Sequence, residues 1–339
     1  YYRMMSFLNN EHEACITVLS PAERKERDSV LERVGEIEDR IQSAYPDWRE
    51  RMAAWETQMK ALPQPKWEAL ELKFDDTSAG GQKCISQGDK SYLAEGYAPT
   101  QFQPKMTTTT TLARIAAVRL ELLPDPNLPR GGPGRSIYGA CALSEFEMRI
   151  APEGTPISEY DKWTPVEIAS AIADVDPPQR LLGSEFPKKE KEGRVTGPIY
   201  LAIDGKAETA WSTDIDPLHR NEAHSAIFIL AKPLEAAPGM VLAFRPAQQH
   251  GGWNSDDNQN NNLGRFRISV TDAESLPDRV LPERVQAALS AADRTDERER
   301  AHDGRDKVAV GGFNVQAEEL DWFSRSRERD ARVSEHHDA

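Results

Sequence analysis

The chain has 339 residues, of which 38% are hydrophobic and 29% are charged, and its formal net charge at pH 7 is -14. A protein this acidic has no overall field that attracts a phosphate backbone, so nucleic acid is not an expected partner. No run reaches the ~18 apolar residues that cross a bilayer, and residues 1–30 lack the basic, apolar and small-residue order of a signal peptide. The mean hydropathy of -0.65 predicts a folded core accompanied by strongly solvated segments.

Three cysteines, Cys15, Cys84 and Cys141, lie far apart in the sequence. This spacing excludes a disulfide-rich scaffold, a C-x-x-C redox or zinc site and a C-x-x-C-H haem attachment. We expect buried free thiols, with a Cys84–Cys141 bridge in an oxidising compartment as the alternative.

Residues 20–62 have helical periodicity in two parts. Ser20, Pro21 and Glu23 predict a capping box with proline at the first helical position. Apolar residues then recur three and four apart on each side of Pro46, as Val30, Val34, Ile37 and Ile41 and as Trp48, Met52, Trp55, Met59 and Leu62. This pattern predicts a helical hairpin or a kinked long helix whose apolar stripes dock on another surface.

From residue 63 the period changes to two. Short segments rich in Val, Ile and Phe are bounded by Gly, Pro or Asn, and they cover residues 66–74, 112–123, 141–150, 225–234, 239–247 and 264–271. Because no amphipathic helix separates these segments, we predict a mainly β fold, an antiparallel β-sandwich over residues 63–274. The last strand should turn Phe266, Ile268 and Val270 toward the core and Arg265, Arg267 and Ser269 outward.

The C-terminal part begins with a further helix. The pattern from Leu276, with Pro282 near the start, predicts this helix within residues 275–300. Residues 301–339 are highly charged, and we expect only partial order in this tail.

Four motifs in order carry a family resemblance: "YYRMMSFLNN", "RLELLPDPNLPRGGPGRSIYGACALSEFEMRI", "IDGKAETAWS" and "LGRFRISVT". They resemble the central segment of large planctomycete cytochrome-c-like proteins, in which a galactose-binding- or discoidin-like jelly-roll sandwich lies between two domains of unknown function. The resemblance covers roughly residues 1–300. It implies that residues 1–19 are the end of the upstream domain, that residues 275–300 lead to the downstream one, and that the haem motif lies outside this chain. It also implies an exported parent protein associated with polysaccharide degradation.

In jelly-roll sandwiches of that type, a D-G-x-x-x-T-x-W signature marks a tight loop, and here it reads Asp204, Gly205, Thr209 and Trp211. Asp-Gly favours a turn, and we expect Trp211 to fold back into the core. The resemblance also implies a structural Ca²⁺ held by Asp204 and by the backbone oxygens of Lys206 and Thr209. A plain hydrogen-bonded turn is the alternative, because no D-x-D-x-D pattern is present.

A second loop, residues 247–266, is rich in Gly, Asn, Gln and Asp. An aromatic ring packs on the C–H face of a sugar and amides bond its hydroxyls, so this loop is our candidate glycan site, with His250, Trp253, Asn254 and Arg265 as candidate contacts. The alternative is a flexible hairpin whose Trp253 packs on the neighbouring helices.

No nucleophile elbow, H-E-x-x-H or P-loop is present in the sequence, and "GGPGR" at 131–135 suits a turn. The only His/Asp cluster, Asp214, Asp216, His219 and His224, suits a solvated loop. We therefore expect a non-catalytic module. Two functions remain open: a module that binds a polysaccharide or other glycan, and a structural module that docks the flanking domains of the parent chain. A third role is completion of an active site together with the upstream haem domain of the parent protein.

Overall fold

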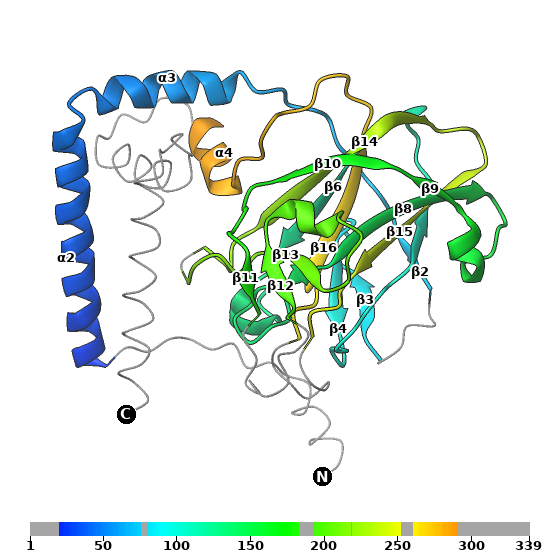
Figure 1. Ribbon diagram of the computed structural model, residues 1–339, viewed down its shortest axis with the longest axis horizontal. Coiled ribbons are helices and arrows are strands. Elements are labelled where there is room, and N and C mark those ends of the chain that lie inside the picture. The colour runs from blue at the N-terminus through cyan, green and yellow to red at the C-terminus, as the bar shows by residue number, and fades with distance from the viewer. Residues whose placement is uncertain (1–19, 76–80, 183–192, 218, 252–259, 291–339) are drawn as a thin grey trace, which may run out of the picture. The chain divides into compact units, whose positions relative to one another are not determined.

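A computed structural model describes residues 20–75, 81–182, 193–217, 219–251 and 260–290 (Figure 1). Within them the chain is mainly β, with strands in sheets that are antiparallel apart from one pair and with few helices, as in a β-sandwich. The three α-helices described are α2 (Pro21–Ala44), α3 (Trp48–Lys60) and α4 (Glu283–Ser290). The predicted mainly β class is thereby confirmed.

The helical segment forms as the sequence predicts. Ser20 caps α2, its hydroxyl accepting from the Glu23 amide while the Glu23 carboxylate accepts from the Ser20 amide at 2.6 Å. The chain leaves the helix at Tyr45–Asp47, because proline at 46 removes a backbone donor. In α3 the apolar stripe ends at Met59, which is buried.

The largest sheet has seven strands. Its order is β10 (Ile168–Ala173), β14 (His224–Glu235), β6 (Arg114–Leu123), β16 (Arg265–Thr271), β4 (Tyr92–Glu95) and β3 (Lys83–Ser86), with β1 (Glu68–Ala69) also paired to β16. Along β6 and β16, Leu120 lies opposite Ile268 and Val118 opposite Val270, so both strands present apolar side chains to one face.

Two smaller sheets complete the β structure. The five-stranded sheet is ordered β2 (Lys73–Phe74), β5 (Met106–Thr108), β15 (Met240–Ala247), β8 (Glu145–Pro152) and β9 (Thr164–Val166). The four-stranded sheet is ordered β11 (Arg180–Leu181), β12 (Val195–Gly197), β13 (Thr209–Ser212) and β7 (Ala142–Leu143), and its β12–β13 pair is parallel.

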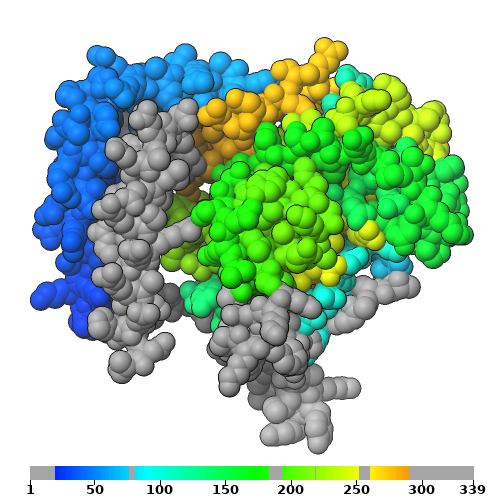
Figure 2. All heavy atoms as spheres, in the orientation of Figure 1, coloured from blue at the N-terminus to red at the C-terminus, as the bar shows by residue number. Residues whose placement is uncertain are grey.

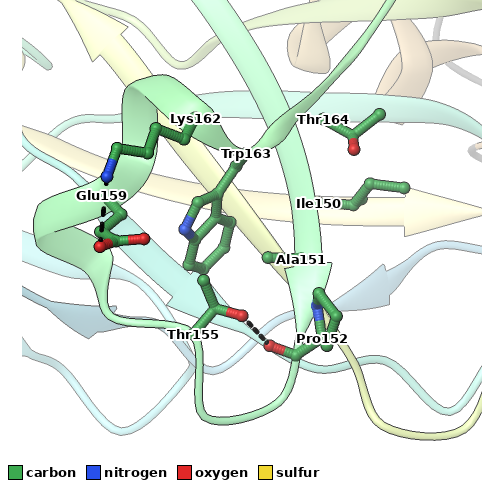
Figure 3. A pocket seen from close by; sticks show the side chains of 8 residues that line it. All are labelled: Ile150, Ala151, Pro152, Thr155, Glu159, Lys162, Trp163 and Thr164. Atoms are coloured by element: carbon green, nitrogen blue, oxygen red, sulfur yellow. Dashed lines mark hydrogen bonds and ion pairs between the residues drawn. The ribbon is translucent and has the colours of Figure 1, made fainter.

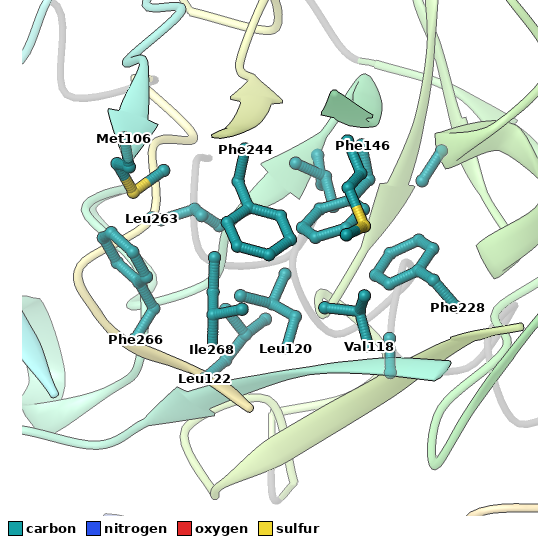
Figure 4. Close-up of a cluster of buried hydrophobic side chains, with 14 of the residues drawn as sticks. Met106, Val118, Leu120, Leu122, Phe146, Phe228, Phe244, Leu263, Phe266 and Ile268 are labelled. Carbon is teal, nitrogen blue, oxygen red and sulfur yellow. The ribbon is translucent and has the colours of Figure 1, made fainter. Parts of the chain in front are cut away.

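The main core lies between the seven- and five-stranded sheets (Figure 4). Phe146 of β8 stacks on Phe228 of β14 with ring centroids 4.0 Å apart and planes 9° from parallel, and Phe244 of β15 lies 6.0 Å from Phe146. Rings from facing sheets therefore contact each other directly, which holds the two layers together.

The strand β16 follows the predicted alternation. Phe266, Ile268 and Val270 are buried in the core. Ser269 is also fully buried although it belongs to the other face, because its hydroxyl donates to Glu121, which in turn accepts from the Arg267 Nε at 2.8 Å. This ion-paired layer covers the serine.

A short segment covers the outer face of the five-stranded sheet. The 3₁₀ helix η2 (Ile157–Lys162) brings Tyr160 over β8 and β15, where the ring is fully buried beneath three cations, Lys105, Arg149 and Arg245. Each cation lies 5.0–5.4 Å from the ring centroid, within the range of cation–π attraction.

Cys84 and Cys141 are free thiols, as expected, but only Cys141 is buried and Cys84 is half-buried. Cys15 lies outside the described residues. The chain divides into two compact units at Glu283 and Arg284, and only Arg284–Ser290 of the second unit is described. The predicted tail, residues 301–339, and the first 19 residues lie outside the described part.

The stacked Phe146–Phe228 pair provides a stability test. Phe228→Ala should lower the free energy of unfolding by about 3–5 kcal/mol, because it removes a fully buried ring and leaves a cavity. Leu181→Ala is the matched control, since that side chain is 70% exposed and its loss should change stability by less than about 0.5 kcal/mol. Urea denaturation measures both; equal losses would contradict the assignment of the core.

Candidate functional site at the loop end of the sandwich

The candidate glycan loop, residues 247–266, is anchored near both ends against residues 98–102. In its N-terminal part, Gln248 and Phe102 exchange backbone hydrogen bonds of 2.8 Å, and the Gly251 amide donates to the Thr100 carbonyl at 3.0 Å. A Cβ at Gly251 would lie 2.1 Å from the Thr100 carbonyl oxygen, so only glycine permits this approach.

In its C-terminal part, asparagine side chains make the equivalent contacts. Asn260 donates to the Ala98 carbonyl at 2.5 Å and Asn262 donates to the Pro99 carbonyl at 2.8 Å. Asn261 donates to the His250 carbonyl at 2.9 Å, and this bond joins the two ends of the loop to each other. These amides, which suggested sugar recognition in the sequence, are used to build the base of the loop.

His250 lies inside this base, with only 1% of its surface exposed. Its Nε2 is 3.2 Å from the carbonyls of Val195 and Glu208, which can only accept, so Nε2 carries the proton. Its Nδ1 then accepts from the Ser144 hydroxyl at 3.0 Å. Both ring nitrogens are bonded to protein groups, and the ring supports the loop from within.

The other predicted contacts are placed differently. Arg265 is held by ion pairs with Asp89 at 2.9 Å and Asp125 at 3.3 Å and by a bond to the Ser91 hydroxyl. Trp253 and Asn254 lie outside the described residues. Of the four predicted contacts, the two that are described, His250 and Arg265, are engaged with protein groups, and Trp253 and Asn254 stay predictions.

Tyr97 is a candidate that the sequence interpretation missed. It directly precedes Ala98, Pro99 and Thr100, the carbonyls that anchor the loop, and 47% of its surface is exposed. The available signal was an aromatic residue in a Gly- and Pro-flanked loop, "EGYAPT", but nothing in the sequence placed this segment beside residues 247–264.

The Asp204 turn forms as predicted. Gly205 has a φ of 78°, and the Asp204 carboxylate accepts from the Lys206 amide at 3.0 Å and from the Thr209 hydroxyl at 2.9 Å. The Thr209 hydroxyl also lies 3.2 Å from the Lys206 carbonyl. The three residues predicted to hold calcium are thus joined by hydrogen bonds.

Glu145 of β8 adds a second carboxyl group to this turn, which the sequence did not suggest. It accepts from the Lys206 amide at 2.9 Å. Burial, with the adjacent Asp204 carboxylate adding to it, raises the pKa of Glu145 to about 7. Two neighbouring carboxyl groups favour either a shared proton or a bound cation.

Trp211 is a core residue, as predicted. It is 1% exposed, and its indole nitrogen donates to the Val175 carbonyl at 3.0 Å. The presence of a tryptophan in this polar loop is therefore explained by its packing in the core and not by a ligand that stacks on the ring.

A small cavity of about 160 Å³ lies beside η2 (Figure 3). It is lined by Ile150, Ala151, Pro152, Thr155, Glu159, Lys162, Trp163 and Thr164. Four of its polar groups are already engaged: the Trp163 indole donates to the Pro156 carbonyl, the Thr155 hydroxyl donates to the Pro152 carbonyl, and Lys162 pairs with Glu159. The space-filling view shows the green side chains packed closely against one another (Figure 2). These bonds leave the cavity with fewer polar groups for a ligand than a binding site needs.

The His/Asp cluster is split in the structure. His224 is buried and paired with Asp174 at 3.0 Å, whereas His219 pairs with Asp216 at 2.9 Å. In the part of the chain that is described, no group of three or more His, Cys, Asp or Glu is placed to hold a metal ion, so a cation at Asp204 would depend on backbone oxygens. None of the described helices has the length and apolar character to traverse a bilayer.

Comparisons with known protein families, with curated proteins and with solved structures found no match.

The buried His250 predicts a dependence of stability on pH. Burial, together with the nearby Arg194 charge, lowers the pKa of His250 to about 4. The unfolded chain therefore binds one more proton between pH 6.5 and 4, and stability should fall by up to about 3 kcal/mol as pH drops through this window. His250→Gln should be less stable at pH 7 yet lack this component of the decline. Chemical denaturation at several pH values measures it, and an unchanged slope in the variant would refute the assignment.

Proposed function

We propose that this chain is a non-catalytic carbohydrate-binding module of an exported protein, with a jelly-roll, galactose-binding-like sandwich as the resemblance to planctomycete cytochrome-c-like proteins implies. The observation that carries the proposal is the position of Tyr97. Its side chain is exposed, and it directly precedes the segment to which both ends of the candidate glycan loop are hydrogen-bonded. Two aromatic residues from adjoining loops suit the apolar faces of a sugar.

The chemistry of this loop end favours a glycan over an ionic ligand. The amides of Gln248, Asn260, Asn261 and Asn262 at its base are neutral and already bonded to protein groups. Two guanidinium groups beside it are engaged as well, Arg135 with the Gly96 carbonyl and Arg194 with the Gly251 carbonyl. A phosphate or carboxylate would need unpaired cations, whereas exposed aromatic rings suit an uncharged sugar.

The hydrogen bonds at both ends of the candidate loop give the proposed site a fixed base. Because residues 98–102 are bonded to both ends of the loop, Tyr97 is presented from a backbone that does not have to be ordered on binding. Ordering costs reduce affinity, so such preorganisation strengthens a small contact surface. We assign His250 a supporting role, and Trp253 and Asn254 remain the proposed direct contacts.

Glycan arrays followed by affinity gels test the proposal on the full chain. Trp253→Ala and Tyr97→Ala should each weaken binding by roughly tenfold, the effect of losing about 1.4 kcal/mol of ring contact. Tyr45→Ala is the matched control, because Tyr45 is 43% exposed but lies at the end of α2, and its binding should equal that of the wild type. Absence of binding to every glycan, or binding that survives both loop substitutions, would refute the module.

We propose further that the Asp204 turn holds a structural Ca²⁺ with Glu145, supported by the adjacent carboxyl groups and by the Lys206 carbonyl. Calcium should then raise the melting temperature, and a chelator should reverse the rise. Asp204→Asn and Glu145→Gln should abolish the shift, whereas Glu153→Gln, at an exposed carboxylate, should retain it. A shift that survives Asp204→Asn would place any ion elsewhere, and no shift in the wild type would leave a plain turn.

A further inference from the structure

A turn at residues 130–140 lies directly beside the candidate glycan loop. The Arg135 amide donates to the Asn262 carbonyl at 2.9 Å, within the C-terminal part of the loop. The Arg135 guanidinium donates to the Gly96 carbonyl, in the residue before Tyr97. The turn is therefore joined both to the loop and to the segment that presents the exposed tyrosine.

The tip of this turn exposes two large side chains. Ile137 and Tyr138 are 44% and 50% exposed. The backbone beneath them is fixed, because the Gly134 amide donates to the Gly139 carbonyl at 2.8 Å and the Gly139 amide donates to the Ser136 carbonyl at 2.8 Å. A ligand that contacts the tip would not have to order this backbone, which favours binding.

Two guanidinium groups lie over the Tyr138 ring. The guanidinium carbons of Arg130 and Arg220 are 5.3 and 5.2 Å from the ring centroid, within the range of cation–π attraction. Arg220 also pairs with Asp214 at 3.2 Å, and Asp214 accepts from Arg180 as well. Within these contacts three guanidinium groups are balanced by one carboxylate, so positive charge is in excess here although the whole chain is acidic.

Arg130 supplies the cation that the base of the loop lacks. Its backbone φ of 54° lies in the left-handed region, which residues other than glycine rarely adopt, so the surrounding turn must hold it there. Its Nε donates to the Ile137 carbonyl at 3.2 Å, while its two terminal nitrogens have no bond to the described residues. A guanidinium with both terminal nitrogens available forms paired hydrogen bonds with an oxyanion.

We propose that this turn is a subsite for an acidic sugar and that the ligand class is therefore an acidic polysaccharide. Arg130 binds the oxyanion of the sugar, a carboxylate or a sulfate ester, and the exposed Ile137 and Tyr138 contact its apolar surface. Tyr138 is three residues from Arg135, a backbone span of at most about 11 Å, so neighbouring units of one chain can reach Tyr97. The inference rests on the proposed function, because it extends the same glycan site.

A glycan array with matched acidic and neutral forms of the same chains tests the subsite on the full protein. Suitable pairs are oligogalacturonates with their methyl esters and sulfated galactans with their desulfated forms. The acidic form should bind about tenfold more tightly at low salt, and added salt should reduce the difference. The two pairs distinguish a carboxylate from a sulfate ester as the preferred oxyanion.

Substitutions assign the preference to the turn. Arg130→Gln should weaken binding of the acidic form by about tenfold and leave the neutral form unchanged. Tyr138→Ala should weaken the acidic form several-fold, because Arg130 loses the ring over which it lies. Arg27→Gln, at an arginine of α2 that is 58% exposed, is the matched control and should keep the wild-type preference. Both arginine variants should melt at the wild-type temperature.

Four results would overturn the proposal. Equal binding of matched acidic and neutral chains, lost in Trp253→Ala, would remove the subsite and leave the carbohydrate-binding module in place. A preference for acidic chains that survives Arg130→Gln would place their recognition elsewhere. Absence of binding to every glycan would refute the subsite and the module together. Binding of polyglutamate, but of no acidic glycan, that Arg130→Gln abolishes would assign the turn to an acidic peptide.

Discussion

The requirement that buried amides be hydrogen-bonded determines the architecture of the loop end. An amide removed from water without a partner costs about 1–3 kcal/mol, so Asn260 and Asn262, which are almost fully buried, must find acceptors. They find them in the carbonyls of residues 98 and 99, and this pairing binds two loops that are distant in sequence. These bonds also place Tyr97 one residue before the segment that joins the described ends of the candidate loop.

The same requirement separates side chains that support the site from those that could contact a ligand. His250 and the asparagines satisfy protein groups, and their burial makes them parts of the scaffold. Aromatic rings do not need such hydrogen-bond partners, and they can remain exposed at a modest cost in free energy. In the proposed function, recognition therefore falls to the rings and to the polar residues of the loop itself.

Much of the fold could be predicted because it depends on local patterns. The capping box at Ser20, the alternation along Phe266–Val270 and the Asp-Gly turn before Trp211 each follow from residues close together in sequence. The contacts that define the candidate site are not local. Glu145 joins the Asp204 turn, and the segment that follows Tyr97 joins the candidate loop at Asn260, only through strand order and long-range hydrogen bonds. The burial of Ser269 was missed for the same reason, because Glu121 on the neighbouring strand β6 accepts from its hydroxyl and pairs with Arg267.

Hydrogen–deuterium exchange of the full chain with and without a bound oligosaccharide tests the central claim most directly, since it reports where the ligand acts. The account predicts that slowed exchange concentrates in residues 96–102 and 247–264 and leaves the η2 cavity unchanged. Protection centred on residues 150–164, or on neither region, would contradict a glycan site at the loop end.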